Sequence, residues 1–507
     1  MPRFSFLVLL CSLWQYTFAQ TFNERFDLFG EGRAQTAWGV EMLPDGNALV
    51  IFNGGYAVDS LYYSSGVSSV LVSPDGSFSE GFRFHVPERA NYPGWVNCVS
   101  PTTDGRFFVG GSTYQAGDTA RVALYWIEPD GTVSDFRELA PPTQEWIGRN
   151  GKQTLDGGYI VVGEMANASA TDLDAFAVKT DAQGNVEWYH IYGGPTREGF
   201  SCVVPDPWGG YYLGGQQQIA GDVWKAWIVR VDAQGEVLGE WNYGSYPFGS
   251  ANAQLTLAPD GTVWVGSAEY HATSIYQGRA SIYQVDTAGE VLWHREYGRL
   301  TRTALFSVLP IPGSTDLIAV GMDDRMGQAG PLQGILLRVD AAHDSLWLRS
   351  YRYYDEQVGY RHSVFNDMQP TPDGGFIAVG MTGPVAGVYS QDVWVVKTDS
   401  MGCIEPGCHL ITGVETQVTN LKDVLRLWPN PVASGGTVQL EVVLPAGFAQ
   451  QGALQLTVVS SDGRLVHSQQ VRQGTNQLST ASLAAGLYHL HLSDADQWIS
   501  GGRLVVE

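Results

Sequence analysis

Positive charge is scarce in this sequence. Charged residues make up only 16% of the 507, the 29 basic residues comprise 5 Lys and 24 Arg, and the net charge is −23. A protein that binds a phosphate backbone needs Lys and Arg to neutralise it. The composition therefore excludes a nucleic-acid partner.

Long hydrophobic runs are also missing. After the first 19 residues, no segment reaches the roughly 18–20 apolar residues that a membrane-spanning helix requires, so we expect no transmembrane span. One shorter apolar stretch, Phe4–Leu13, follows Arg3 and precedes the small residues Thr17 and Ala19. This order is typical of a signal peptide. Residues 1–19 are therefore predicted to be a cleaved export signal.

Cysteine is rare. Removal of residues 1–19 leaves four of the five: Cys98, Cys202, Cys403 and Cys408. The last two lie in GCIEPGC, where a Pro-Gly pair can turn the chain, so we predict a local disulfide in an oxidising compartment. A zinc site is the alternative, for which His409 is the one adjacent ligand candidate. Cys98 and Cys202 lie in apolar runs and are interpreted as buried small hydrophobic residues. Whether they pair stays open.

Signatures of catalysis are absent as well. The sequence contains no GxSxG, HExxH, phosphate-binding loop or paired CxxC motif. It therefore offers no motif for a serine hydrolase, a zinc peptidase, a nucleotide-binding enzyme or a zinc ribbon. We predict no catalytic residue and no cofactor from motifs.

Glycine and aromatic residues are abundant instead. The chain has 61 Gly, and Phe, Trp and Tyr together make up 12%. Aromatic and β-branched residues favour strands, and Gly favours tight turns. The composition predicts an all-β protein with many short connections.

Internal repeats organise this β-structure. One series of turns is marked by Asp45-Gly46, Asp104-Gly105, Asp156-Gly157, Trp208-Gly209, Asp260-Gly261, Ser314-Thr315 and Asp373-Gly374. A second series interleaves with it at Asp75-Gly76, Asp130-Gly131, Asp181, Asp232, Asp286, Asp340 and Asp399. Successive members lie 51 to 59 residues apart. Asp-Gly between apolar runs indicates a hairpin, so each repeat holds two hairpins, or four strands.

Four-stranded sheets repeated in this way indicate a β-propeller. Seven repeats predict seven blades over residues 20–410. The seventh repeat lacks a fourth strand, because the chain turns into GCIEPGC after Asp399. FNERFDLFG at residues 22–30 has the pattern of the missing strand, and we expect it to close the ring. Trp188, Trp241, Trp293 and Trp347 recur once per blade, which favours blade packing over a sugar-binding platform.

The repeat unit resembles a known family. DAFAVKTDAQGNVEWYHIYGG, with DPWGGYYLGG after it, is similar to the bacterial seven-bladed propeller repeat called SBBP. KAWIVRVDAQGEVLGEWNYG and ASIYQVDTAGEVLWHREYG match nearly as well, whereas the first two repeats match poorly. The resemblance implies a propeller and no particular activity.

A second domain follows residue 410. Residues 411–424 have no strong hydrophobic pattern and are interpreted as a linker. Residues 425–507 contain short strands and frequent turns, which suggest a small β-sandwich. In GLYHLHL the residues alternate, with Tyr488, Leu490 and Leu492 on one face and Leu487, His489 and His491 on the other. This alternation predicts a half-buried strand.

The C-terminal domain closely resembles the type A sorting domain of the type IX secretion (Por) system. The matching residues are Pro429-Asn430-Pro431, Asp462-Gly463-Arg464, Gly486, Tyr488 and Arg503 in the terminal RLVVE. Ser460 and Arg503 depart from the family, which usually has Asp and Lys there. The resemblance implies the type IX machinery as a partner. It further implies a protein that is secreted or attached to the outer cell surface.

Function should lie on the face opposite the Asp turns, because loops on a rigid scaffold usually carry binding. Its candidate residues are Tyr270, His271, Asp323, Asp324, Arg325, Tyr353, Tyr354, Asp355, Glu356, Arg361 and His362. Solvated loop charge is the plainer interpretation of each. Calcium held by Asp172, Asp174, Asp323 and Asp324 is a further possibility, although no EF-hand spacing supports it.

Two hypotheses for the activity remain open. The first is a non-catalytic binding or adhesion module for glycan or protein. The alternative is an extracellular polysaccharide-degrading enzyme, either a hydrolase or a lyase. Convergent carboxylates in the central pocket would favour the enzyme, and an aromatic patch without them would favour binding. A purely structural module is the third option.

Overall fold

The computed structural model describes most of the chain. The described residues are 21–29, 34–57, 63–115, 119–139, 145–166, 173–221, 223–244, 249–271, 277–324, 331–355, 359–360, 362–383, 391–410, 415–419, 421–448, 450–495 and 497–507. The predicted export signal at residues 1–19 lies outside them.

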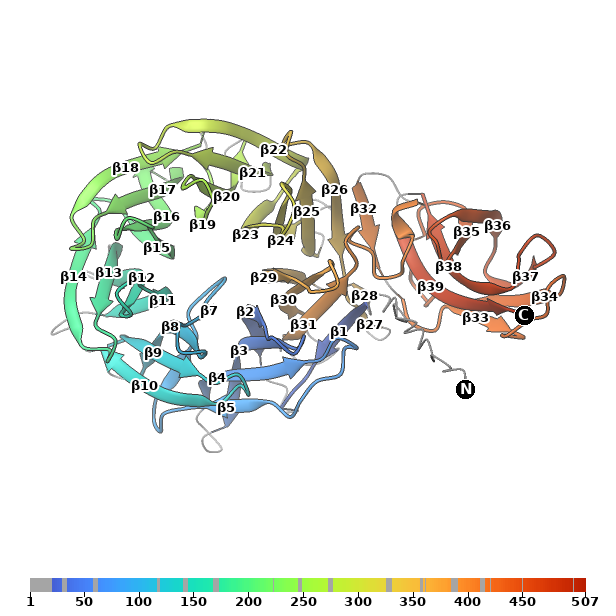
Figure 1. Cartoon of the computed structure of the whole chain (residues 1–507), viewed down its shortest axis with the longest axis horizontal. Coiled ribbons are helices and arrows are strands. Elements are labelled where there is room, and N and C mark those ends of the chain that lie inside the picture. The colour runs from blue at the N-terminus through green and yellow to red at the C-terminus, as the bar shows by residue number, and fades with distance from the viewer. Residues whose placement is uncertain are drawn as a thin grey trace, which may run out of the picture.

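Within these residues, seven antiparallel sheets form a ring, and a smaller β-domain lies beside it (Figure 1). Blades 1 and 2 contain β2 (Gln35–Met42), β3 (Ala48–Ala57), β4 (Tyr63–Val72) and β5 (Phe82–Phe84), then β6 (Ala90–Tyr92), β7 (Val99–Pro101), β8 (Phe107–Tyr114), β9 (Arg121–Ile127) and β10 (Val133–Leu139). Blades 3 and 4 contain β11 (Trp146–Gln153), β12 (Tyr159–Ala166), β13 (Leu173–Thr180) and β14 (Val186–Tyr192), then β15 (Glu198–Pro205), β16 (Tyr211–Ala220), β17 (Val223–Val231) and β18 (Val237–Tyr243).

The remaining blades complete the ring. Blades 5 and 6 contain β19 (Gln254–Leu257), β20 (Val263–Tyr270), β21 (Gly278–Val285) and β22 (Val291–Thr301), then β23 (Thr303–Pro310), β24 (Leu317–Asp323), β25 (Gln333–Val339) and β26 (Ser345–Tyr351). Blade 7 contains β29 (Ser363–Pro370), β30 (Phe376–Thr382), β31 (Asp392–Thr398) and β1 (Phe22–Phe26). A short β27 (Tyr354–Asp355) pairs with β28 (Gly359–Tyr360) between blades 6 and 7. The predicted seven-bladed propeller is confirmed.

The N-terminal segment closes the ring, as predicted. β1 pairs antiparallel with β31, from Phe22 opposite Lys397 to Phe26 opposite Val393. Phe22 and Phe26 are buried in one hydrophobic cluster with residues of blades 7 and 1. The side chain of Asn23 joins the strand to its neighbours, because Nδ2 donates to the Arg352 carbonyl at 3.0 Å and Oδ1 accepts from the Trp394 indole at 2.6 Å. Closure thus depends on residues more than 320 positions apart in the sequence.

The Asp turns form because the carboxylate caps the backbone of its own turn. In blade 3, Asp181 accepts hydrogen bonds from the amides of Gln183 and Asn185 at 2.9 and 2.8 Å. Gly184 takes a φ of 78°, which costs glycine little. Both turn series connect strands at the same end of each blade, so they lie on one face of the ring.

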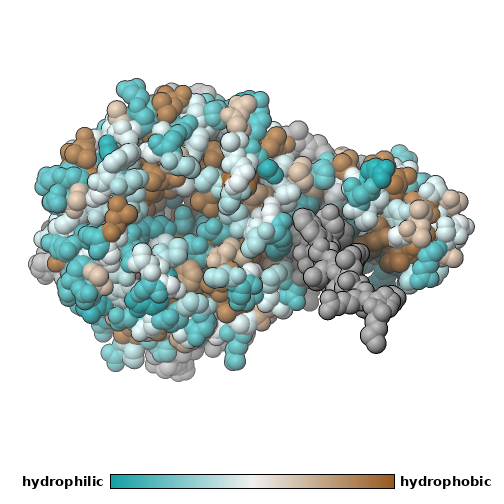
Figure 2. All heavy atoms as spheres, in the orientation of Figure 1, coloured by the Kyte–Doolittle hydropathy of each residue, from teal (hydrophilic) through white to brown (hydrophobic). Residues whose placement is uncertain are grey.

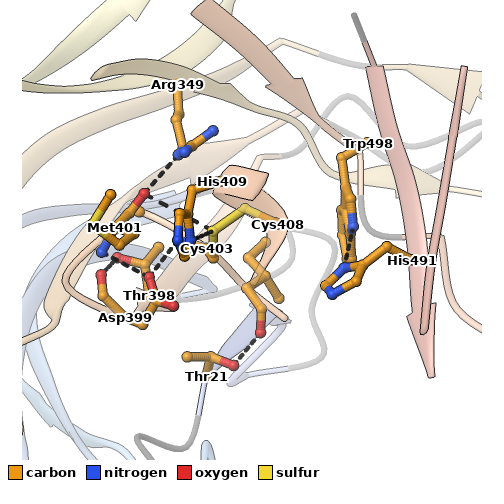
Figure 3. The surroundings of a disulfide bond; sticks show 12 residues. Thr21, Arg349, Thr398, Asp399, Met401, Cys403, Cys408, His409, His491 and Trp498 are labelled. Carbon is orange, nitrogen blue, oxygen red and sulfur yellow. Dashed lines mark hydrogen bonds between the residues drawn. A yellow bond between two sulfur atoms is a disulfide. The ribbon is translucent and has the colours of Figure 1, made fainter. Parts of the chain in front are cut away.

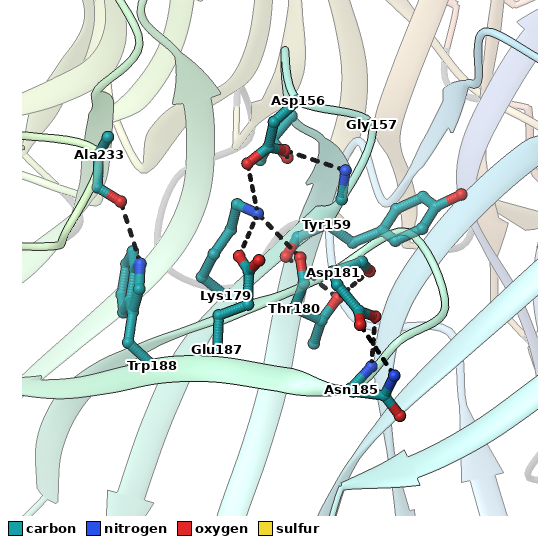
Figure 4. A network of polar contacts seen from close by, with 12 residues as sticks. Asp156, Gly157, Tyr159, Lys179, Thr180, Asp181, Asn185, Glu187, Trp188 and Ala233 are labelled. Carbon is teal, nitrogen blue, oxygen red and sulfur yellow. Dashed lines mark hydrogen bonds and ion pairs between the residues drawn. The ribbon is translucent and has the colours of Figure 1, made fainter.

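In several blades a Lys or Arg at the end of the third strand pairs with an acidic residue of the first turn, as Figure 4 shows for blade 3. Lys179, 1% exposed, contacts Asp156 at 2.9 Å and Glu187 at 2.8 Å and donates to the Thr180 carbonyl. The same penultimate position of the third strand forms the pairs Arg230–Asp206, Arg338–Asp316 and Lys397–Asp373. A buried cation needs such a partner, because an unpaired one would be strongly destabilising.

Recurring Tyr and Trp residues join each blade to the next. The hydroxyl of Tyr243 donates to the Gly289 carbonyl in the second turn of the next blade at 2.9 Å. Tyr192, Tyr297 and Tyr351 make the same bond to Gly235, His343 and Gly402. A Cβ atom on Gly289 would lie within 2.1 Å of the Trp241 ring. The recurring Trp side chains therefore pack between blades, as expected.

The C-terminal domain is a β-sandwich that continues the sheet of blade 6. Its strands are β33 (Leu425–Trp428), β34 (Thr437–Val442), β35 (Leu454–Ser460), β36 (Leu465–Val471), β37 (Gly474–Ser479), β38 (Gly486–Asp494) and β39 (Gln497–Val506). Residues 411–424, interpreted as a linker, include β32 (Glu415–Val418), which pairs in parallel with both β26 and β39. A nine-stranded sheet thus runs from the propeller into the sandwich (Figure 1).

A disulfide loop lies at this junction (Figure 3). The predicted Cys403–Cys408 bond is present, and both cysteines are buried in one cluster with Trp347 and with Trp498 of β39. Cys98 and Cys202 are buried and free, as interpreted. From the loop, Glu405 contacts His489 of β38 at 2.6 Å. A short 3₁₀ helix, η1 (Cys408–Leu410), follows the loop.

The loop explains one wrong prediction from the sequence. Alternation in GLYHLHL predicts a half-buried strand, but His489 is 4% exposed and His491 is fully buried. A Cβ atom on Gly407 would lie 3.4 Å from His491 Nε2, so the disulfide loop covers the face that we expected to be open. Burial lowers the pKa of His491 to about 3, and its Nδ1 accepts from the Trp498 indole at 3.1 Å.

The matched C-terminal motifs have structural roles. Asn430, between Pro429 and Pro431, donates to the Arg503 carbonyl at 2.8 Å and accepts from the Val505 amide at 3.0 Å, which holds the last strand. Asp462 and Arg464 pair across the Gly463 turn, and Tyr488 donates to the Ala484 carbonyl near Gly486. These residues fix the ends of strands. On the face of the molecule seen in Figure 2, the surface is mainly hydrophilic and its hydrophobic side chains are scattered.

Truncation of Phe26 tests the ring closure. Phe26→Ala should lower the free energy of unfolding by about 3–5 kcal/mol, because the Phe26 side chain is buried where the propeller closes. Denaturant titration of the full chain measures it. Leu155→Ala, on a turn where the side chain is 70% exposed, is the control and should change stability by less than about 0.5 kcal/mol. Equal effects of the two variants would show that the seam contributes little.

Reduction tests the disulfide loop. Loss of the Cys403–Cys408 bond, which joins residues at a sequence separation of 5, should lower the free energy of unfolding by about 2 kcal/mol. Denaturation with and without reductant measures the loss. The double variant Cys403→Ala/Cys408→Ala should be less stable and insensitive to reductant. A wild-type chain that is equally stable in reductant contradicts the prediction.

Candidate ligand-binding site

The described candidate residues named from the sequence lie in two regions, one at blades 5 and 6 and one between blades 6 and 7. His271, next to Tyr270, contacts Glu296 in blade 5 at 2.6 Å. Asp323 is buried in blade 6, where it accepts from the Thr301 and Thr303 hydroxyls. Asp324 is also buried, and its amide donates to the Arg302 carbonyl at 2.9 Å.

The other candidates lie between blades 6 and 7. Tyr353 packs against the cluster that holds the disulfide, and Tyr354 against apolar residues of the C-terminal domain. The Tyr354 ring is therefore partly covered by that domain. His362 is exposed, and its Nδ1 accepts from the Leu332 amide at 2.9 Å. Arg325, Glu356, Arg361 and the side chain of Asp355 lie outside the described residues.

Calcium ligation gains no support from the described part of the chain. Asp172 lies outside it, and the remaining described residues contain no cluster of three or more His, Cys, Asp or Glu side chains placed to hold a metal ion. The Asp323 carboxylate instead accepts hydrogen bonds from two threonine hydroxyls.

A pocket of about 350 Å³ lies elsewhere, across blades 1 to 3. Its lining residues are Trp38, Asn53, Tyr92, Gly94, Trp95, Ser112, Tyr114, Ala120, Glu145, Ile147, Gly148 and Arg149. Tyr114 ends β8 and Glu145 precedes β11, so the pocket lies at the end of the blades opposite the Asp turns. This is the face on which we expected function, but a different part of it.

Bulges aim two of the lining residues into the pocket. The register of β2 against β3 shifts between Ala37 and Gly39, which leaves Trp38 as the extra residue. The register of β11 against β12 shifts between Gly148 and Asn150, which leaves Arg149. A bulge re-aims a side chain and is common beside binding sites. The Trp38 indole is fixed by a 2.7 Å hydrogen bond that it donates to Oδ1 of the Asn53 side chain.

The connection between blades 1 and 2 supplies the other wall. β6 pairs with β8, and Trp95 follows it, with its amide donating to the Arg149 carbonyl at 2.6 Å. Glycine permits this close approach: Gly94 has a φ of 91°, and a Cβ atom on Gly111 would lie 2.0 Å from the Tyr92 carbonyl oxygen. The connection thus brings Tyr92 and Trp95 to the pocket.

The charged residues around the pocket differ in whether another described residue pairs with them. Arg149 is paired with Glu164, and its guanidinium lies 5.8 Å from the centre of the Trp95 ring. Glu145 is partly exposed, and its carboxylate makes no hydrogen bond or ion pair with the described residues. Tyr92 and Tyr114 are 40% and 44% exposed. Burial and the neighbouring Tyr114 raise the pKa of Tyr92 above its usual range, so its hydroxyl is neutral at physiological pH.

Two further carboxyl groups lie on the innermost strands of blades 1 and 7. Burial raises the pKa of Glu41 on β2 to about 8 and that of Asp367 on β29 to about 7, although nearby Lys152 opposes both shifts. Asp367 is 1% exposed and accepts from the Val40 amide at 3.0 Å. The Asp367 charge further raises the pKa of Glu41. The pair therefore favours protonation near neutral pH.

Sequence reasoning missed the aromatic pocket, although a signal was present. Trp38 and Arg149 each lie seven residues before the first Asp turn of their blade, and Asn366, also a bulged residue, lies at the same position in blade 7. The side chain at this position differs from blade to blade. The first two repeats also match the repeat unit poorly, and they supply most of the pocket. Departure from the repeat was the available clue.

Comparison with known families assigns the C-terminal domain. Residues 426–507 match the family described as a secretion system C-terminal sorting domain. The domain is therefore a type IX sorting domain that engages the secretion machinery, and the protein is secreted or attached to the outer cell surface. No helix in the described part of the chain is long and apolar enough to cross a membrane.

Similarity to other proteins is distant. No curated protein matches the chain. A protein of unknown function from Dyadobacter fermentans is 13% identical, with 63% of this chain and 99% of that chain covered and a TM-score of 0.40. An α-L-arabinanase from Penicillium chrysogenum is 12% identical, with 75% and 98% covered and a TM-score of 0.40. A Streptococcus pneumoniae sialidase is 10% identical, with 75% and 70% covered and a TM-score of 0.37. Likeness at this level bears on neither activity nor ligand.

Asp367 should make stability depend on pH. Its folded-state pKa of about 7 lies above the ordinary value of 3.8, so the folded state binds more protons between these values. Stability from this group is present at low pH and is lost as pH rises toward 7. Asp367→Asn should remove about 2 kcal/mol of that loss between pH 4 and pH 8.

Denaturant titrations across this pH range measure the effect. Glu80→Gln, which replaces an exposed carboxylate on blade 1, is the control and should leave the profile unchanged. Parallel profiles for wild type and Asp367→Asn would mean that Asp367 titrates normally in the folded chain.

Proposed function

We propose that the propeller is a non-catalytic binding module that takes part of a glycan into the aromatic pocket of blades 1 to 3. The observation that carries this proposal is the pocket lining, in which two Trp and two Tyr side chains surround about 350 Å³. Aromatic rings offer flat apolar surfaces to the C–H faces of a sugar, and a few polar groups then orient its hydroxyls. Asn53 and Ser112 are such groups.

The dimensions favour a glycan over a folded protein partner. Pockets of roughly 300–1,000 Å³ enclose small ligands, whereas a protein interface buries about 800 Å² on each partner. The pocket is concave and is built by the scaffold strands β2, β8 and β11, which hold its side chains in place before binding. A preformed site loses less conformational entropy when it binds.

The carboxylates support binding over hydrolysis. Glycosidases use two carboxyl groups that flank the scissile bond. Among the described residues that line the pocket, Glu145 is the single acid, and nearby Glu164 is paired with Arg149. Glu41 and Asp367 form a pair with raised pKa values, but they lie on β2 and β29, and neither lines the pocket.

Substitution of the aromatic residues tests the proposal. Trp38→Ala and Tyr114→Ala should each weaken retention on a responsive polysaccharide about tenfold or more, because each removes a stacking surface. Affinity electrophoresis of the full chain over bacterial and algal polysaccharides measures it. Trp208→Ala is the matched control, because Trp208 is 64% exposed on the turn face. Release of new reducing or unsaturated ends would instead support an enzyme.

A further inference from the structure

The charged residues of the pocket indicate which class of glycan it binds best. Arg149 is neutralised by Glu164, with which its guanidinium forms an ion pair. Glu145 then remains as the charge without a partner among the described residues. Arg149, its partner Glu164 and Glu145 together sum to one negative charge at the pocket, beside its aromatic rings.

Glu145 is held in place although its carboxylate is unpaired within the described part of the chain. Its carbonyl accepts from the Ala166 amide at 3.1 Å, and the next residue, Trp146, donates to the Ala120 carbonyl at 2.9 Å. Both sides of Glu145 are thus anchored to neighbouring strands of blades 2 and 3. These bonds fix the backbone of Glu145 beside the pocket, and the carboxylate stays within side-chain reach of a cation bound there.

The aromatic rings favour a cation in the same place. The faces of Trp and Tyr rings attract positive charge. Trp95 already shows this preference, because the Arg149 guanidinium lies 5.8 Å from its ring centre. Trp38, Tyr92 and Tyr114 remain to face a ligand. The net charge of −23 adds a long-range attraction for positively charged ligands, which salt screens.

We propose that the pocket selects amine-bearing sugars, such as glucosamine units without their N-acetyl groups, over neutral sugars of the same shape. The sugar ring stacks on Trp38, Tyr92 or Tyr114, and its ammonium group pairs with Glu145. This inference rests on the proposed glycan-binding function. It adds the chemical class of the ligand and names Glu145 as the residue that determines specificity.

A Lys-bearing peptide is the competing cationic ligand, and the pocket suits it less well. Peptides commonly bind by adding a strand to a free sheet edge. At the pocket, β8 already pairs with β9 on one side and with β6 and β7 on the other. β2 and β11 are edge strands, but at the pocket the Trp38 carbonyl already accepts from the Cys98 amide at 3.5 Å and the Arg149 carbonyl from the Trp95 amide at 2.6 Å. A sugar ring needs no free edge.

Calorimetric titration of the full chain tests the proposal. The probes are glucosamine oligomers and N-acetylglucosamine oligomers of equal length. We expect the amine form to bind about tenfold more tightly in low salt, since a hydrogen bond to a charged group is worth roughly this factor. Glu145→Gln should remove the preference, so that the two oligomers bind about equally to the variant. Glu290→Gln, an exposed site on the turn face, is the control for lost charge.

The outcomes separate the two proposals. Binding of neither oligomer, or binding that Trp38→Ala does not weaken, would overturn glycan recognition at the pocket itself. Equal binding of both oligomers, or a preference that persists in Glu145→Gln, would overturn the amine selectivity alone. Binding of a Lys-rich peptide but of neither sugar would replace both proposals with peptide recognition. A preference equally reduced by Glu290→Gln would assign it to overall charge instead of Glu145.

Discussion

Closure of the ring by β1 is the contact on which the rest of the structure depends. Six blades complete their own sheets from neighbouring sequence, but blade 7 obtains its outer strand from Phe22–Phe26. Without that strand, β31 would present an open edge, and the hydrophobic cluster between blades 7 and 1 would lose Phe22 and Phe26. The strands that shape the ligand pocket belong to this ring, so the geometry of the pocket depends on the closing seam.

Elsewhere in the ring, a small set of repeated contacts holds the blades together. Tyr hydroxyls bond to the turn of the next blade, Trp rings cover the turn glycine, and a Lys or Arg at the end of the third strand pairs with an acidic residue of the first turn. These contacts gather at the turn face and the outer rim. The opposite face is therefore free to vary, and there the first two blades depart from the repeat to build the aromatic pocket.

The sorting domain is attached more firmly than a flexible tail. β32 extends the sheet of blade 6 into the sandwich, and Trp498 shares a buried cluster with the disulfide and with Trp347. Glu405 contacts His489 across the junction. Residues 415–418 form a strand although they have no hydrophobic pattern, because the edges of two sheets flank them. Pairing with those edges uses backbone hydrogen bonds, which do not depend on the type of side chain. The chain thus carries its export domain packed against the propeller.

The sequence by itself determined what repetition and local chemistry can specify: seven blades, their turns, the closing strand, the disulfide and the sorting domain. Each rests on short-range patterns such as Asp-Gly turns or the GCIEPGC spacing, whose physics acts within a few residues. Only the tertiary structure decided which side chains share a pocket. Trp38 and Arg149 lie 111 positions apart, and bulges and glycine contacts bring them together in a pocket that neither Tyr270 nor Asp323 lines. The burial of His489 and His491 likewise depended on a loop from another part of the chain, which no local alternation can reveal.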